Sequence, residues 1–107
     1  MMLIEANKIP ESNLIWKYSN PKTSQKRAFH FFGKNAILYR STKKNKKYMI
    51  ERNNGTFVHF GQIPYEDFTK HKNTKRRKNY LNRSSKIKGD WKKDKYSANN
   101  LARKILW

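Results

Sequence analysis

The sequence predicts a small α+β protein: an antiparallel β-meander with a hairpin, followed by one or two basic helices and preceded by an extended N-terminal arm. Three observations predict this class. Asn54-Gly55 lies between two runs of aromatic and β-branched residues, basic residues follow helix-capping signals, and the first stretch has no periodicity. The 107 residues suffice for one domain. We expect an arm over residues 1–28 and a small basic α+β domain with a basic helical tail over residues 29–107.

The arm contains two prolines and a polar run, which favour extended chain and turns. Its apolar residues have two interpretations: they anchor the arm in pockets of a neighbouring protein, or they cap the sheet of this chain. Both stay open at this point. The candidate apolar anchors are Leu14, Ile15, Trp16 and, at the other end of the chain, Trp107.

Strands are expected where short apolar runs are bounded by turn residues. Residues 28–32 and 36–40 fit this pattern, with Gly33-Lys34-Asn35 between them. Asn-Gly is the preferred two-residue hairpin turn, so residues 47–52 should pair with residues 56–60. With that turn Ile50 opposes His59, and both faces of the hairpin carry apolar groups. We therefore expect the hairpin to be covered on both faces.

Helices are expected in the last part of the chain. Glu66-Asp67 after Pro64 suits a negatively charged first turn. Asn73 is a capping residue for a helix that runs to Arg83. Ser97 can cap a final short helix over residues 98–106, and residues 84–90 between the two helices are expected to form a loop.

The charge predicts a negatively charged partner. There are 26 Lys and Arg against 7 Asp and Glu, a net charge of +19, and residues 69–107 carry +12 of it. Lys outnumbers Arg by 19 to 7, which suits diffuse neutralisation of phosphate or an acidic protein surface better than base-specific reading. The candidate polyanion- or partner-binding residues are Lys70, Lys72, Lys75, Arg76, Arg77, Lys78, Arg83, Lys86, Lys88, Lys92, Lys93, Arg103 and Lys104.

Several classes of chemistry are disfavoured. The chain has no cysteine, and its few carboxylates and histidines show no repeated metal-ligand spacing, so we expect no catalytic residue, metal, cofactor or small-molecule substrate. No stretch approaches the roughly 18 apolar residues of a membrane span. Phe31, Tyr48 and Phe57 suit either base stacking or core packing, and a chain this short favours core packing.

The order of motifs from residue 47 to residue 107 carries a resemblance. The motifs are Val58-His59-Phe60-Gly61, Tyr65-Glu66-Asp67-Phe68-Thr69-Lys70-His71-Lys72, Arg76-Arg77-Lys78-Asn79-Tyr80-Leu81, Ile87-Lys88-Gly89-Asp90-Trp91 and Lys95-Tyr96-Ser97-Ala98-Asn99-Asn100-Leu101 before Ile105-Leu106-Trp107. This series resembles a family of small basic proteins of large double-stranded DNA viruses of eukaryotes, whose chemistry is not established. The resemblance implies a viral setting, and we expect the protein in the virion, with host-cell cytoplasm or a viral factory as the place of assembly.

Two functional hypotheses follow. In the first, which we favour from the sequence, the chain is a non-enzymatic structural virion protein, a minor capsid or cement component whose basic surface bridges larger capsid proteins. In the second, it is a non-specific DNA- or RNA-binding protein that coats the viral genome, or a ribosomal-type RNA-binding protein. The partners are thus larger virion proteins or viral nucleic acid.

Overall fold

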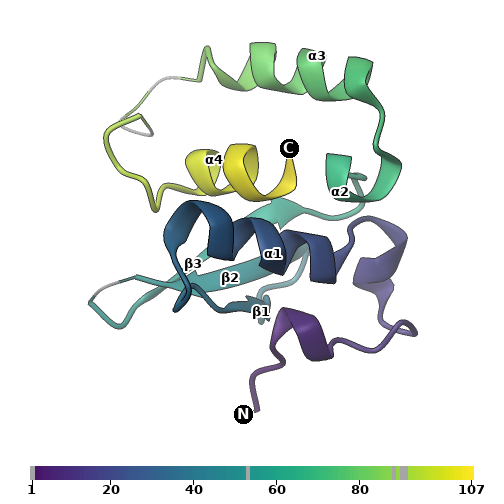
Figure 1. Cartoon of the computed structure of the whole chain (residues 1–107), viewed down its shortest axis with the longest axis vertical. Helices are drawn as coiled ribbons and strands as arrows, with labels where there is room; N and C mark the ends of the chain where they lie inside the picture. Colours follow the sequence, from purple (N-terminus) through teal and green to yellow (C-terminus); the bar gives the residue numbers. More distant parts are fainter. Residues whose placement is uncertain (1, 53, 88, 90–91) are drawn as a thin grey trace.

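The fold is α+β, as predicted, with helices packed over one face of a small sheet (Figure 1). The computed structural model describes residues 2–52, 54–87, 89 and 92–107. The antiparallel sheet has the order β1 (Leu38–Arg40), β2 (Lys46–Glu51) and β3 (Phe57–Gln62). Helix α1 (Pro21–Phe32) packs on the sheet and against the turn that follows α4 (Ala98–Leu101), and α3 (Thr74–Ser84) lies farther out, beyond α4.

The predicted hairpin is confirmed, but its register differs by one residue. Ile50 pairs with Val58 and Tyr48 with Phe60, whereas a two-residue turn would place Ile50 opposite His59. Arg52 N donates to Thr56 O at 2.7 Å, so the loop between these residues is one residue longer than expected, and Gly55 takes a positive φ of 84°. A shift of one residue exchanges the two faces of a strand. The shift places Phe60 and Val58 on the same face as Tyr48 and Ile50.

That face forms the core. Leu38, Tyr48, Ile50 and Phe60 are buried there against Ala28 of α1 and against apolar side chains of the C-terminal helices. Cover on both faces was predicted, and the second face is covered only in part. Met49 is buried on it, whereas Tyr39, Phe57 and His59 stay half-exposed.

Residues 28–32 belong to helix α1, so the strand predicted there is wrong. The helix begins in what was expected to be extended arm, because Asn20 Oδ1 accepts from Lys22 N and Thr23 N, and Pro21 fits the first helical position. The buried Gln25 then fastens the helix to the sheet: Nε2 donates to Ala36 O at 2.7 Å and Oε1 accepts from Leu38 N at 2.8 Å. Helix α1 therefore spans the expected boundary between residues 28 and 29.

Only a short arm precedes α1, and it is folded onto the domain. It contains two 3-10 turns, η1 (Ala6–Lys8) and η2 (Leu14–Lys17), and Glu5 forms a bridge to Tyr39 at the edge of the sheet. Ala6, Ile9 and Ile15 are buried in the core. Residues 2–20 are thus part of the domain rather than a free extension.

The helices predicted after the sheet are confirmed, but Glu66 and Asp67 do not form the first turn of α2 (Phe68–His71) as expected: Asp67 is the residue that caps the helix and Glu66 precedes it. Helix α2 is one turn long, Asn73 caps α3 as expected, and Ser97 Oγ accepts from Asn100 N at the start of α4. The last turn, η3 (Ala102–Leu106), is π-helical, with Trp107 N donating to Ala102 O at 3.1 Å. Leu101, Ile105 and Leu106 fill the core from this end of the chain.

Candidate polyanion-binding site

A buried ion pair holds the connection between the sheet and the basic helix. Lys47 Nζ on β2 donates to Asp67 Oδ2 at 3.0 Å, and the two side chains are only 2% and 1% exposed. The other carboxylate oxygen of Asp67 accepts from Thr69 N at 3.0 Å and caps α2. Burial lowers the pKa of Lys47, and the neighbouring Asp67 carboxylate opposes that shift. Each charge depends on the other, because neither reaches water.

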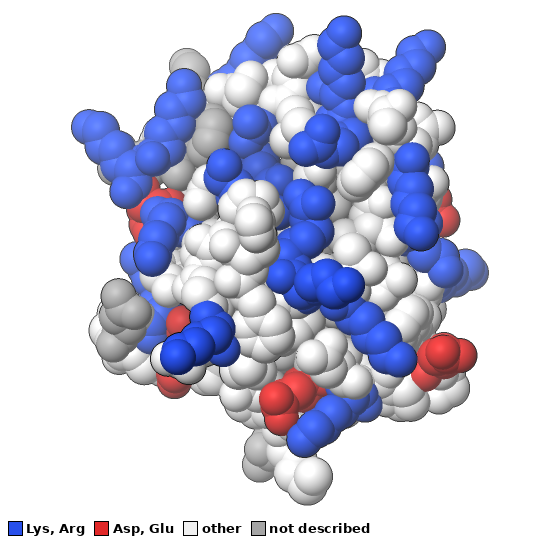
Figure 2. All heavy atoms as spheres, viewed as in Figure 1, with Lys and Arg blue, Asp and Glu red and all other residues white. Residues whose placement is uncertain are grey.

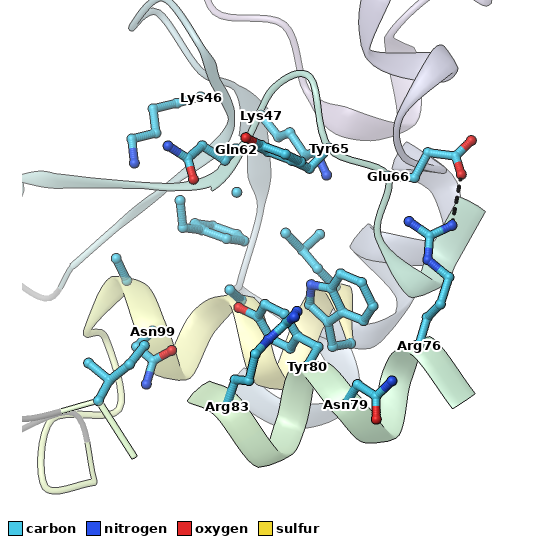
Figure 3. A pocket seen from close by; sticks show the side chains of 17 residues that line it. Lys46, Lys47, Gln62, Tyr65, Glu66, Arg76, Asn79, Tyr80, Arg83 and Asn99 are labelled. Atoms are coloured by element: carbon cyan, nitrogen blue, oxygen red, sulfur yellow. Dashed lines mark hydrogen bonds and ion pairs between the residues drawn. The ribbon is translucent and has the colours of Figure 1, made fainter. Parts of the chain in front are cut away.

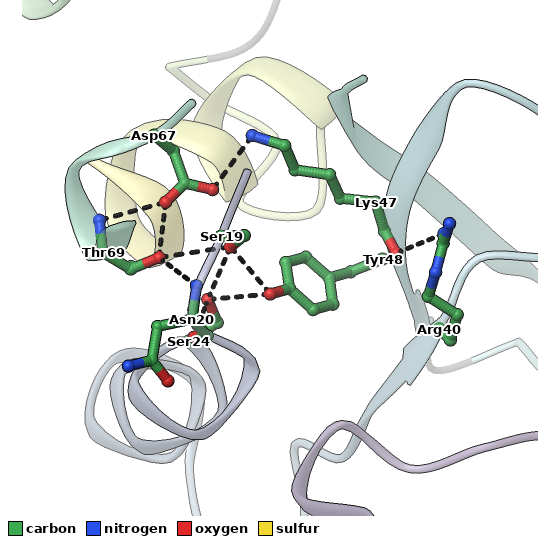
Figure 4. A network of polar contacts seen from close by, with 8 residues as sticks. All are labelled: Ser19, Asn20, Ser24, Arg40, Lys47, Tyr48, Asp67 and Thr69. Atoms are coloured by element: carbon green, nitrogen blue, oxygen red, sulfur yellow. Dashed lines mark hydrogen bonds and ion pairs between the residues drawn. The ribbon is translucent and has the colours of Figure 1, made fainter. Parts of the chain in front are cut away.

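Polar contacts extend from this pair to the start of α1 (Figure 4). Thr69 Oγ1 accepts from Asn20 N at 2.9 Å and lies 3.1 Å from Ser19 Oγ. The Tyr48 hydroxyl donates to Ser19 Oγ at 2.7 Å, and burial raises the pKa of this phenol. Tyr48 is therefore a core residue that joins β2 to the segment before α1, and it offers no free face for base stacking.

Helix α3 presents a dense group of positive charges on the molecule's periphery. Residues 74–84 include five basic and no acidic residues, and all five basic side chains are exposed. In Figure 2, Lys and Arg side chains project along the upper edge, where α3 lies in the same view. Tyr80 and Leu81 turn toward the domain and are half-buried. The helix thus rests on a narrow apolar seam, and its basic side chains lie at the surface.

Two of the predicted binding arginines also attach α3 to the domain. Arg77 Nε donates to Trp107 O at 2.5 Å, and its guanidinium lies 5.4 Å from the Phe68 ring centroid. Arg103 on η3 donates from Nη1 to Leu81 O at 2.7 Å and to Ser84 Oγ. The rings of Tyr80 and Trp107 stack with centroids 4.2 Å apart and an interplanar angle of 9°. Part of the bonding capacity of these arginines is therefore used inside the molecule.

The other predicted binding cations differ in the contacts that they make within the protein. Lys75, Lys78 and Arg83 are exposed, and no ion pair to them occurs within the described part of the chain. Arg76 pairs with Glu66 at 3.3 Å, a surface contact of small energetic value. Lys88 lies outside the described residues. The remaining predicted positions, all exposed, are Lys70, Lys72, Lys86, Lys92, Lys93 and Lys104, and Lys104 Nζ lies 5.5 Å from the Phe31 ring centroid.

A pocket of about 670 Å³ separates α3 from β3 and the C-terminal helices (Figure 3). Aromatic side chains from β3, the following loop, α3 and the last residue line it: Phe60, Tyr65, Tyr80 and Trp107. Lys46 and Gln62 face it from the sheet, and Arg83 and Asn99 from the helices. Sequence reasoning did not single out this pocket, because its walls come from segments far apart in the chain.

The four predicted apolar anchors differ in how far they are buried in this chain. Ile15 is wholly buried in the core of this chain, so its interpretation as an anchor in a neighbour is wrong. Trp16 is half-buried and donates from Nε1 to Ile9 O at 3.1 Å, and Trp107 is half-buried against Tyr80. Leu14 is 55% exposed and is the one of the four that projects from the surface. The competing interpretation, capping of the chain's own sheet, fits Ile15 because it packs with the core.

The acidic and histidine side chains do not gather into a metal site in the residues that the structure describes. The Asp67 carboxylate already forms an ion pair with Lys47. His59 Nδ1 lies 2.7 Å from Ser41 Oγ on the second face of the sheet, whereas His71 Nδ1 accepts from Asn73 N at 2.9 Å near α3. Burial, and after it the charge of Arg76, lowers the pKa of His71.

The structure is thus a small basic α+β domain with a cationic helix and an adjoining aromatic pocket. In the comparison with known families, a family of unknown function, DUF5754, matches residues 36–84. This range covers the sheet, α2 and α3 and leaves out α1 and the C-terminal helices. No curated protein and no solved structure matches the chain. Within the described residues, no helix is long and apolar enough to cross a membrane.

Proposed function

We propose that this chain is a non-enzymatic protein that binds nucleic acid through phosphate contacts made by α3, without reading base sequence. The observation that carries the proposal is the exposed positive charge of α3, where Lys75 and Lys78 have no ion-pair partner in the described part of the chain. Nucleic acid supplies a regular array of phosphates that neutralises such a helix and releases counterions. The excess of Lys over Arg supports phosphate contact over base reading.

The setting we propose is a virion of a large double-stranded DNA virus, with assembly in the host cytoplasm or a viral factory. It rests on the ordered motifs of residues 47–107. In that setting a small cationic domain would coat or condense packaged genome, since net charge of this size favours non-specific contact with polyanions.

The location of the charge can be tested with two double variants of equal net charge. Lys75→Gln with Lys78→Gln removes two exposed cations from one face of α3, and Lys22→Gln with Lys26→Gln removes two exposed cations from α1. We expect the α3 variant to lose affinity for a DNA duplex on the order of 100-fold at about 50 mM salt, measured by fluorescence anisotropy. The α1 variant should lose no more than about threefold, because distant charges are screened. Equal losses would show that net charge, and not α3, determines binding.

A structural virion role remains the second candidate, favoured by exposed apolar residues before α1. Met2, Leu3, Ile4 and Leu14 are exposed, which suits contact with a larger capsid protein. Deleting the arm is not a usable test, because Ala6, Ile9 and Ile15 belong to the core. Leu14→Ser instead changes a side chain that is 55% exposed and keeps these core residues. Loss of incorporation into particles with unchanged DNA affinity would favour the capsid role over genome coating.

A further inference from the structure

We propose that the pocket between α3 and β3 binds one unpaired nucleotide of a single strand, with its base among the aromatic side chains and its phosphate between Lys46 and Arg83. This inference rests on the proposed function and adds a single-strand preference to it. Helix α3 alone predicts contact with any phosphate chain. The pocket predicts that the bases also contribute.

The size and walls of the pocket suit a flat ring. Its volume of about 670 Å³ lies within the range of small-ligand sites. Tyr65 stands at its edge with 65% of its surface exposed, and its ring lies across the pocket from the helices (Figure 3). Tyr80 is already stacked on Trp107, so these two rings form one side of the pocket as a unit. A base entering here would meet Tyr65 as a free stacking surface.

The charges around the pocket suit a phosphate. Lys46, Lys47, Arg76 and Arg83 line it, and Glu66 is the acidic residue among the lining residues. Lys47 is neutralised by Asp67, and Arg76 by Glu66. Lys46 and Arg83 then remain as cations for which the described residues provide no ion-pair partner, one on each side of the pocket. The net charge of the lining residues is therefore positive and lies beside the aromatic side chains. This suits a nucleotide, which has a negative phosphate and a flat base.

Amide side chains supply contacts for a base edge. Gln62, Asn79 and Asn99 line the pocket from the sheet, from α3 and from α4. Asn99 Nδ2 donates to Ser84 O at 3.2 Å, which leaves its oxygen as an acceptor directed by that bond. Amides carry both donors and acceptors and so accept several bases. We therefore expect a preference for unpaired bases with little discrimination among them.

The test compares oligothymidine with an abasic strand that has the same length and phosphate charge. The wild-type protein should bind oligothymidine about 5- to 140-fold more tightly, the range expected for one stacked base. Tyr65→Ala should bring the two affinities together, and because Tyr65 is largely exposed, circular dichroism should show an unchanged fold. The control is Phe31→Ala, which removes an exposed aromatic ring of α1 and should retain the preference for oligothymidine.

The outcomes separate the pocket from the proposed function. Equal wild-type affinities for the two strands, with a loss on Lys75→Gln and Lys78→Gln, would overturn the pocket and leave phosphate binding by α3 in place. Absence of binding to either strand would overturn both. Loss of the preference in Phe31→Ala but not in Tyr65→Ala would also refute the pocket. Displacement of oligothymidine by thymidine 5′-monophosphate would show that a free nucleotide enters it as well, whereas a base preference without displacement would show that it takes the nucleotide within a strand.

Discussion

Replacing Asp67 with Ser is expected to destabilise the protein by about 3–5 kcal/mol, the typical cost of removing one partner of a buried ion pair. Serine is itself a good helix cap, so the contact to Thr69 N can be kept while the negative charge is lost. Lys47 Nζ would then be left buried, with its charge unpaired. Urea unfolding followed by tryptophan fluorescence measures the free energy of unfolding.

A second variant separates the stranded charge from other effects of the substitution. Lys47→Met with Asp67→Ser removes both charges and keeps an unbranched side chain on β2. We expect it to recover at least half of the lost stability, because a neutral replacement of a buried pair is often tolerated. A single variant that loses less than about 1 kcal/mol, or a double variant no more stable than the single one, would contradict the role given to this pair.

Gly61→Ala is expected to cost about 2–4 kcal/mol, because strain and overlap act together. Gly61 has a φ of 79°, and a Cβ placed there would lie 2.9 Å from Leu106 Cδ1 and 3.0 Å from Lys47 Cβ. The Lys47 Cβ is attached directly to the backbone of β2 and cannot give way as a flexible side-chain end does. The position therefore combines an unfavourable backbone conformation with close packing between the sheet and η3.

Gly55→Ala is the matched control for this prediction. Gly55 has nearly the same φ, 84°, but nothing lies within 4 Å of a Cβ built on it. It should cost only the backbone strain, about 1–2 kcal/mol. Equal losses in the two variants, compared by urea unfolding, would show that the contact with Leu106 and Lys47 contributes nothing.

For the hairpin, the pairing of the strands was predictable from the sequence and the loop length was not. Asn54-Gly55 correctly predicted a reversal and the pairing of β2 with β3. The number of loop residues was not readable from that dipeptide, because a Gly with a positive φ, such as Gly55, also serves longer hairpin loops. The resulting shift moved Phe60 to the core face with Tyr48.

Helix α1 forms where the sequence contains both a strand signal and a helix signal. The aromatic run of residues 28–32 suits a strand, and short apolar runs do not distinguish strand from helix by periodicity. The capping pair Asn20-Pro21 was the available helix signal, and with Gln25 fixed to β1 it prevailed.

The site was predictable in its charge and not in its shape. The basic run with Asn73 as cap identified α3, since both features are local. The Lys47–Asp67 pair and the pocket join residues from different elements, so they depend on how β2, α2 and the C-terminal helices pack. Tyr65 in particular lacked any local signal that it would stand beside a cavity.

The central claim, phosphate binding by α3, is tested most directly by the salt dependence of DNA affinity. The association constant for a duplex should be measured between about 50 and 200 mM salt for the wild-type protein and for Lys75→Gln with Lys78→Gln. The logarithm of the constant should fall linearly with the logarithm of salt concentration, and the double variant should flatten that slope by about 1.8 units, one phosphate contact for each lysine. An affinity independent of salt, or an unchanged slope in the double variant, would contradict the account.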